Sequence, residues 1–226
     1  EMLRSMCHER AARELPALFG VAHNYLAISG GGAQGAFGAG LLAGWTETGR
    51  RPEFQMVTGV STGALIAIWA FLGPDYDDLL DALYTTTSTH DIVRRRFWLA
   101  VPFTDAAADS TPLLDLLRRT VTDDIVDKIA AEYGRGRRLF IGTADLDSMR
   151  PRIWDLTRIA ASGHPQAKNL IHSILLASAS IPGLMPPVRI EVEAKGERYD
   201  ELHVDGGTAA QVFVYPTVTN WRRVLD

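Results

Sequence analysis

The sequence contains a single cysteine, Cys7, among its 226 residues. One cysteine excludes a disulfide within the chain and any zinc cluster built from several thiolates. It gives no information on whether the protein works in an oxidising or a reducing compartment.

An excess of positive charge is also lacking, since the net charge is −4 at pH 7. Domains that bind duplex nucleic acid usually carry a strongly basic face. We therefore expect no nucleic-acid partner.

Long hydrophobic runs are absent as well. The longest, Ala64 to Leu72, is about half of the ~20 residues that a membrane-spanning helix requires, which is typical of a buried core helix. Residues 1–24 contain no apolar stretch of the signal-peptide type, and we expect them to form an N-terminal helical extension. The protein is expected to be cytoplasmic or bound peripherally to a membrane.

The remaining composition, 46% hydrophobic and 22% charged, is that of a globular domain with a well-buried core. Strand-like runs are Leu26–Ser29, Phe54–Thr58, Leu139–Thr143, Arg152–Leu156, Val188–Val192 and Tyr199–Val204. Helical spacing is found in Gly35–Trp45, Ala64–Phe71, Asp77–Tyr84, Pro112–Val121 and in a segment that starts near Pro165 and ends before Pro182. Alternating strands and helices predict an α/β fold with a mainly parallel sheet, whose sites form at the carboxyl ends of strands.

A glycine-rich turn, Gly30 to Gly35, follows the first strand and opens a helix. Its spacing satisfies the dinucleotide-binding pattern, which also needs an acidic residue after the second strand. The nearest candidate, Glu53, lies before that strand. A bound nucleotide is therefore disfavoured, and the alternative is an anion that exists only during a reaction.

The segment after the second strand, "GVSTG", favours that alternative. It is a G-x-S-x-G sequence between a strand and a helix, the context of a nucleophile elbow that exposes Ser61. Gly59 and Gly63 leave room for so sharp a turn. Backbone N–H groups of Gly30, Gly31 and Gly32 could stabilise an oxyanion by roughly 3 kcal/mol per donor. A helix cap formed by chance is the competing interpretation.

A serine nucleophile needs a base. Asp205 stands at the end of a predicted strand, before Gly206 and Gly207, although a plain Asp-Gly turn is equally common. Common α/β hydrolases place a histidine near the end of the chain, and none follows His203. His172 lies within a predicted helix, where a lone histidine is more often packed than catalytic.

Four motifs, "GGGAQG", "GVSTG", "ASASIPGLMPPV" and "DGG", occur in the order seen in patatin-like phospholipases, and the chain resembles that family from Tyr25 to Gln211. The resemblance implies a three-layer α/β/α fold, acyl-ester lipid substrates, and no metal or organic cofactor. It implies that Ser61 is the nucleophile and Asp205 the base. It also implies an oxyanion hole at Gly30, Gly31 and Gly32, with Gly35, Gly59, Gly63, Gly206 and Gly207 supporting the motifs.

Two features depart from the family pattern. Many members carry Arg or Lys where this chain has Ala33 and Gln34, and only residues 208–226 follow the last motif. We therefore expect residues 25–226 to form a patatin-like catalytic domain that lacks its C-terminal part.

The segment "DIVRRRFWLAVPF" mixes basic and aromatic residues in a way that suits an anionic membrane surface. A surface helix with one core-facing side is an equally good interpretation. The candidate lipid contacts are Arg94, Arg95, Arg96, Phe97 and Trp98.

Together these patterns predict a serine lipid acyl hydrolase of the phospholipase A, lysophospholipase or esterase type, with a Ser-Asp dyad. The alternatives are an esterase with a Ser-His-acid triad and a catalytically inactive lipid-binding module.

Overall fold

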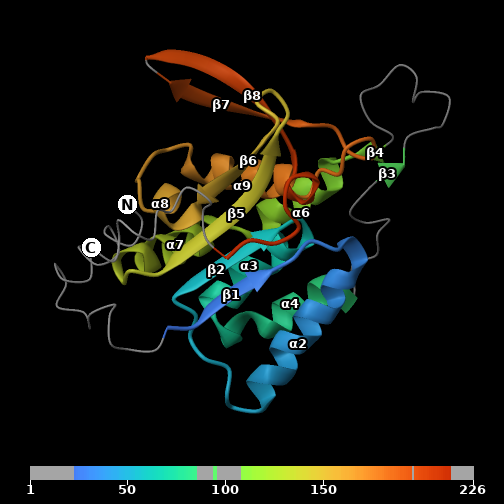
Figure 1. The fold of residues 1–226 in the computed structure, drawn as a ribbon. Coiled ribbons are helices and arrows are strands. Elements are labelled where there is room, and N and C mark those ends of the chain that lie inside the picture. The colour runs from blue at the N-terminus through green and yellow to red at the C-terminus, as the bar shows by residue number, and fades with distance from the viewer. Residues whose placement is uncertain (1–22, 86–93, 96–107, 195, 215–226) are drawn as a thin grey trace.

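Three neighbouring strands of the sheet, from its β1 edge inwards, run parallel (Figure 1). The computed structural model describes residues 23–85, 94–95, 108–194 and 196–214. In sheet order the strands are β1 (Tyr25–Ile28), β2 (Met56–Val60), β5 (Arg138–Asp145), β8 (Glu197–Asp205) and β7 (Val188–Ala194), with β6 (Arg150–Asp155) also paired to β5. Strands β6 and β8 pair antiparallel with β5, and β7 pairs antiparallel with β8 in a long hairpin. The α/β class with a mainly parallel centre is confirmed.

The helices between these strands are α2 (Gly35–Glu47), α3 (Thr62–Leu72), α4 (Asp77–Thr85), α6 (Thr111–Thr120), α7 (Asp123–Gly134), α8 (Leu156–Ala160) and α9 (Ala167–Ser178). Single 3-10 turns are η1 (Gly32–Gln34), η2 (Pro74–Tyr76) and η4 (Gly206–Thr208), and β3 (Arg94–Arg95) pairs with β4 (Ala108–Asp109). No helix in the described part of the chain is long and apolar enough to cross a membrane. The predicted N-terminal extension, residues 1–24, lies almost wholly outside the described residues.

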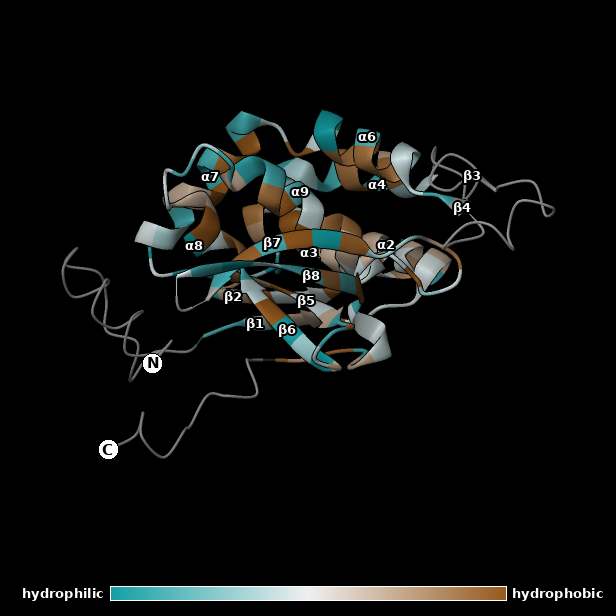
Figure 2. Cartoon of the chain, turned by 90° about the horizontal axis from the view of Figure 1, so that it is seen from above, coloured by the Kyte–Doolittle hydropathy of each residue, from teal (hydrophilic) through white to brown (hydrophobic). Residues whose placement is uncertain are grey.

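Helix α3 is the centre of the core. Nine of its residues are buried, from Thr62 to Phe71, because it packs against β2 on one side and against α2 and α9 on others. A helix that is apolar on every side is stable only in such surroundings. Helices α3, α8 and α9 lie on one face of the sheet, and α4, α6 and α7 lie outside them (Figure 2).

The segment around Phe213 lies on the opposite face of the sheet. The Thr58 hydroxyl donates a hydrogen bond to the Phe213 carbonyl, and the Phe213 ring lies close to Gly142. The second helical layer that the family resemblance implies is not seen among the described residues. The chain after β8 therefore returns along β2 and β5 on this second face of the sheet.

Three elements differ most from the sequence-based expectation: strand β2 and helices α7 and α8, the last of which begins at Leu156, where the sequence predicts the end of a strand. Strand β2 begins two residues later than predicted and continues through Val60, because its parallel pairing with β5 extends to Gly142. Helix α7 was not predicted, although Asp123 and Asp124 begin it and Ile125, Val126 and Ile129 form its buried side. Its charged residues mask that apolar spacing.

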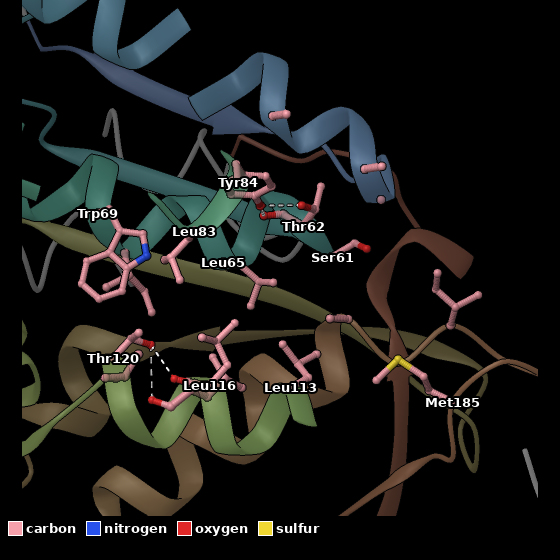
Figure 3. Close-up of a pocket in the computed structure, with 18 of the residues that line it drawn as sticks. Ser61, Thr62, Leu65, Trp69, Leu83, Tyr84, Leu113, Leu116, Thr120 and Met185 are labelled. Atoms are coloured by element: carbon pink, nitrogen blue, oxygen red, sulfur yellow. Dashed lines mark hydrogen bonds between the residues drawn. The ribbon is translucent and has the colours of Figure 1, made fainter. Parts of the chain in front are cut away.

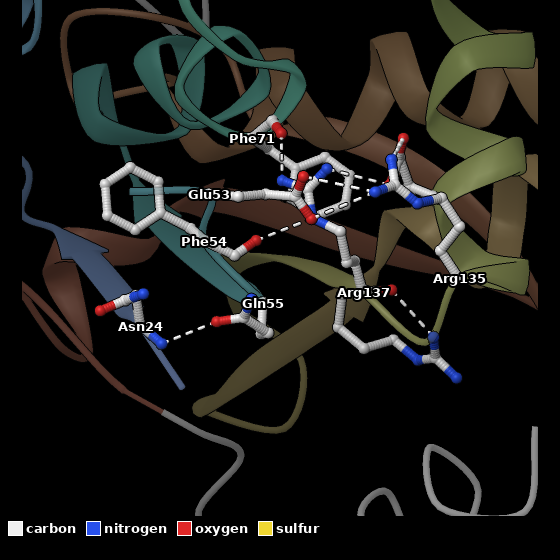
Figure 4. A network of polar contacts seen from close by, with 9 residues as sticks. Asn24, Glu53, Phe54, Gln55, Phe71, Arg135 and Arg137 are labelled. Atoms are coloured by element: carbon white, nitrogen blue, oxygen red, sulfur yellow. Dashed lines mark hydrogen bonds and ion pairs between the residues drawn. The ribbon is translucent and has the colours of Figure 1, made fainter. Parts of the chain in front are cut away.

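A buried arginine connects the start of β2 to the ends of α3 and α7 (Figure 4). The Arg137 guanidinium donates hydrogen bonds to the carbonyl oxygens of Phe54 and Phe71 and to Glu132 Oε2, the last at 2.9 Å. It also lies over the Phe71 ring, 4.3 Å from its centroid. Neighbouring Arg135 pairs with Glu132 and Glu53, but its side chain is 53% exposed.

We expect Arg137→Met to lower the free energy of unfolding by about 3 kcal/mol, because it removes the hydrogen-bond donor to Glu132 Oε2 and to two buried carbonyl oxygens. The matched change Arg135→Met should cost about 1 kcal/mol or less, since exposed pairs contribute little. Urea denaturation of both variants measures the difference. Equal losses would contradict the role assigned to Arg137.

Candidate active site

Strands β2 and β8 end opposite each other on the same edge of β5. The last β2 residue, Val60, pairs with Gly142, and the last β8 residue, Asp205, pairs with Thr143. Strand β6 occupies the other edge of β5 at both positions. Because β2 runs parallel to β5 and β8 runs antiparallel, their carboxyl ends meet. The residue after Val60 is Ser61, so the topology brings Ser61 and Asp205 together.

Ser61 stands on a strained turn between β2 and α3. Its backbone angles are φ 56° and ψ −128°, a conformation that costs a residue other than glycine about 1–3 kcal/mol. The flanking glycines are required by close backbone contacts. A Cβ on Gly59 would lie 2.4 Å from the Gly63 carbonyl oxygen, and one on Gly63 would lie 2.4 Å from the Ile28 carbonyl oxygen. This is the geometry that the G-x-S-x-G pattern predicts.

The two predicted catalytic side chains are in direct contact. Ser61 Oγ donates a hydrogen bond to Asp205 Oδ2 at 2.6 Å, while Asp205 Oδ1 accepts one from the Gly207 N–H at 2.7 Å. Both side chains are nearly buried. Burial raises the pKa of Asp205, and the hydrogen bonds from Ser61 and Gly207 partly offset that increase. A carboxylate with a raised pKa is a stronger base than an ordinary one.

Neither candidate histidine has a hydrogen bond to Ser61 or Asp205. His203 is fully buried, with Nδ1 3.1 Å from Thr143 Oγ1 and Nε2 3.1 Å from Glu201 Oε2. His172 Nε2 donates to the Val121 carbonyl oxygen at 2.8 Å. Burial lowers the pKa of both imidazoles.

The glycine loop lies against the elbow. A Cβ on Gly30 would be 3.1 Å from Ser61 Cβ, so this loop passes directly beside Ser61. The Gly30 N–H, however, donates to the Gln211 carbonyl oxygen at 3.0 Å, which corrects the expectation that it serves an oxyanion. Within the described residues no acceptor is found for the N–H groups of Gly31 and Gly32. These two N–H groups are therefore the ones that stay candidates for an oxyanion hole.

Two further glycines permit close packing around the site. A Cβ on Gly35 would lie 2.3 Å from Thr62 Oγ1, and one on Gly206 would lie 2.4 Å from the Gly142 carbonyl oxygen. Gly35 thus allows α2 to begin against the elbow, and Gly206 allows β8 to end against β5. Gly207 contributes the N–H that Asp205 accepts.

An apolar cavity of about 240 Å³ opens beside Ser61 (Figure 3). It runs along α3, with Ser61 near one end and Trp69 near the other, and α6 forms its opposite wall (Figure 3). Its lining includes Gly32, Leu65, Leu113 and Met185. The sequence did not predict this cavity, because its walls come from five separate segments. Such a cavity suits a hydrocarbon chain.

Of the five candidate lipid contacts, Arg94 and Arg95 belong to strand β3, while Arg96, Phe97 and Trp98 lie outside the described residues. In the part of the chain that the structure describes, no group of three His, Cys, Asp or Glu residues could hold a metal ion.

The family model for patatin-like phospholipase matches residues 26–218. Among solved structures, the crystal structure of VipD from Legionella pneumophila is similar in fold, with a TM-score of 0.54 and 14% sequence identity. The match covers 88% of this chain and 48% of the VipD chain, so this chain spans about half the length of VipD. Among curated proteins, none matches the chain.

The crowding around Gly59 gives a direct test of the elbow. Gly59→Ala should lower the free energy of unfolding by at least about 2 kcal/mol, because the new methyl group would meet backbone atoms that cannot move away. Gly40→Ala, on the exposed side of α2 with no atom near its Cβ, should be neutral or stabilise by up to about 1 kcal/mol. Urea denaturation distinguishes the two, and a stable Gly59→Ala protein would contradict the turn geometry.

Proposed function

Because the chain belongs to the patatin-like phospholipase family, whose members hydrolyse ester bonds, we propose that it is a serine hydrolase that removes acyl chains from lipids. The observation that carries the proposal is the 2.6 Å hydrogen bond from Ser61 Oγ to Asp205 Oδ2, beside an apolar cavity. In this proposal Ser61 is the nucleophile and Asp205 is the only base.

The first half of the reaction forms an acyl-enzyme. Asp205 Oδ2 takes the proton of Ser61 Oγ as that oxygen attacks the carbonyl carbon of the ester. The negative charge that develops on the carbonyl oxygen is stabilised by the N–H groups of Gly31 and Gly32. The bond to the alcohol then breaks, and Asp205 returns its proton to the departing alcohol oxygen.

The second half releases the acid. Asp205 takes a proton from a water molecule, and the resulting hydroxide attacks the acyl carbon bound to Ser61. When that intermediate breaks down, Ser61 Oγ leaves the acyl carbon and recovers the proton from Asp205. The same carboxylate therefore serves both steps, first with the serine and then with water.

The cavity indicates the substrate class. An acyl chain that enters beside Ser61 and extends along α3 to Trp69 would pass eight helical residues, a length of about 12 Å at 1.5 Å per residue. The walls are almost entirely aliphatic and aromatic. An acyl chain of moderate length, attached to a head group that stays outside, fits this space.

Two rival functions make different demands. A Ser-His-acid esterase requires a histidine that contacts Ser61, whereas His172 and His203 are hydrogen-bonded elsewhere. An inactive lipid-binding module would not react with a fluorophosphonate, which labels only a working serine nucleophile.

Contact of the Arg94–Trp98 segment with an anionic membrane surface remains a proposal from the sequence.

Replacing the proposed base separates the dyad from a triad. Asp205→Asn should reduce kcat on a soluble ester almost as much as Ser61→Ala, by roughly 10⁴-fold or more, because nothing else can accept the proton. The double variant should be hardly worse than either single one. In the unmodified protein kcat/KM should rise with pH through an apparent pKa above the ordinary carboxyl value, since only ionised Asp205 acts as a base.

The histidines provide the matched controls. His203→Gln and His172→Gln should each keep most of the activity per folded molecule, as judged by circular dichroism. A well-folded, inactive histidine variant beside an active Asp205→Asn would overturn the dyad. Absence of fluorophosphonate labelling on the unmodified protein would overturn the enzyme assignment itself.

The cavity can be shortened at Leu65, which points into its middle (Figure 3). Leu65→Phe should lower kcat/KM for long-chain p-nitrophenyl esters by tenfold or more, because each excluded methylene forfeits about 0.8 kcal/mol. Hydrolysis of the acetate ester should stay within about threefold, since its acyl group does not reach that depth. Leu41→Phe, on the exposed face of α2, is the control and should leave the chain-length profile unchanged.

A further inference from the structure

The carboxyl end of α9 touches both residues of the proposed dyad. The Ser178 hydroxyl accepts a hydrogen bond from the Ser61 N–H at 3.0 Å, and the Ser180 carbonyl oxygen accepts one from the Asp205 N–H at 2.8 Å. From these contacts, and resting on the proposed function, we infer that Ser178 is a positioning residue that holds the nucleophile in its reactive conformation. The proposed reaction does not otherwise use this side chain.

The Ser178 hydroxyl is held in one orientation. It is fully buried, and it donates its single proton to the Gly142 carbonyl oxygen at 2.7 Å. With the proton directed there, a lone pair faces the Ser61 N–H. Ser61 is the residue after Val60, the last residue of β2 that pairs with β5. The Ser178 side chain therefore connects Ser61 to β5 just where the direct pairing of β2 with β5 ends.

The acceptor of that proton is common to both halves of the site. Gly142 lies beside Thr143, the β5 partner of Asp205, and its carbonyl oxygen is the atom that Gly206 closely approaches. Ser178 thus ties Ser61 to the same peptide group against which the strand carrying Asp205 ends. A nucleophile fixed to that peptide keeps its distance from the base.

Ser61 needs such support because its backbone lies in the left-handed region. Without a hydrogen-bond acceptor, the buried Ser61 N–H would be costly, and a local rearrangement that gave it another acceptor would become favourable. A small rotation of this peptide would move Oγ relative to Asp205, and displacements of about 1 Å can cost about 10²-fold in rate. The hydrogen bond to Ser178 also occupies the Ser61 N–H, so this group is not an oxyanion donor.

The inference predicts a loss of rate rather than of binding. Ser178→Ala should lower kcat on a soluble ester about 10- to 100-fold, with KM within about twofold and with slower fluorophosphonate labelling of Ser61. Ser178→Thr, which keeps the hydroxyl, should recover part of the rate. By hydrogen-exchange mass spectrometry, the peptide that contains Ser61 should exchange faster in Ser178→Ala than in the unmodified protein.

Thr157→Val is the control, because it deletes an equally buried hydroxyl that bonds to Asp155 instead. It should leave kcat and the exchange of the Ser61 peptide unchanged. A Ser178→Ala protein with unaltered kcat and unaltered exchange, or a Thr157→Val protein with the same losses, would overturn the inference. Failure of the proposed function would look different, since the unmodified protein would then neither hydrolyse esters nor take up the label, while the exchange comparison would still report on Ser178.

Discussion

The site depends on two strands that end opposite each other along one edge of β5. Strand β2 arrives parallel and β8 antiparallel, so Val60 and Asp205 reach neighbouring β5 residues, Gly142 and Thr143. The registers of these two pairings therefore fix the separation of two side chains that are 144 residues apart in the sequence. A shift of either strand by one residue would turn its side chains to the other face of the sheet and separate Ser61 from Asp205.

Close packing around this junction explains four of the glycines. Gly59, Gly63, Gly35 and Gly206 each lie where a Cβ would come within 2.4 Å of another atom. None of these four positions needs a left-handed backbone, which is instead found at Ser61. The surrounding glycines and the buried core of α3 hold the strained serine in place, so the cost of its conformation is met by packing elsewhere.

The sequence was informative where chemistry requires particular residues at fixed spacing. It predicted the strands and helices on both sides of Ser61, because hydrophobic runs and glycine turns are local patterns. The pairing of Ser61 with Asp205 was implied only by the resemblance to the patatin-like family, since a strand-end aspartate before two glycines is also a common turn. The sequence assigned no role to Ser178, although this residue belongs to the "ASASIPGLMPPV" motif. A serine at the end of a helix can serve many purposes, so the pattern alone does not indicate one. It also counted Gly30 as an oxyanion donor, since only the folded chain brings the Gln211 carbonyl oxygen to that N–H.

The same burial that suits Asp205 to its proposed role as base also destabilises the fold when this carboxyl is ionised. Its pKa is raised in the folded protein because the site excludes water. The folded state therefore holds the proton more tightly than the unfolded chain, and stability declines as pH rises from the ordinary carboxyl value through the raised one. The hydrogen bonds from Ser61 and Gly207 limit this penalty, because both favour the ionised form. Since Ser61 supplies one of these bonds, the contact that would prepare Ser61 for attack in the proposed reaction also stabilises the charge of the proposed base.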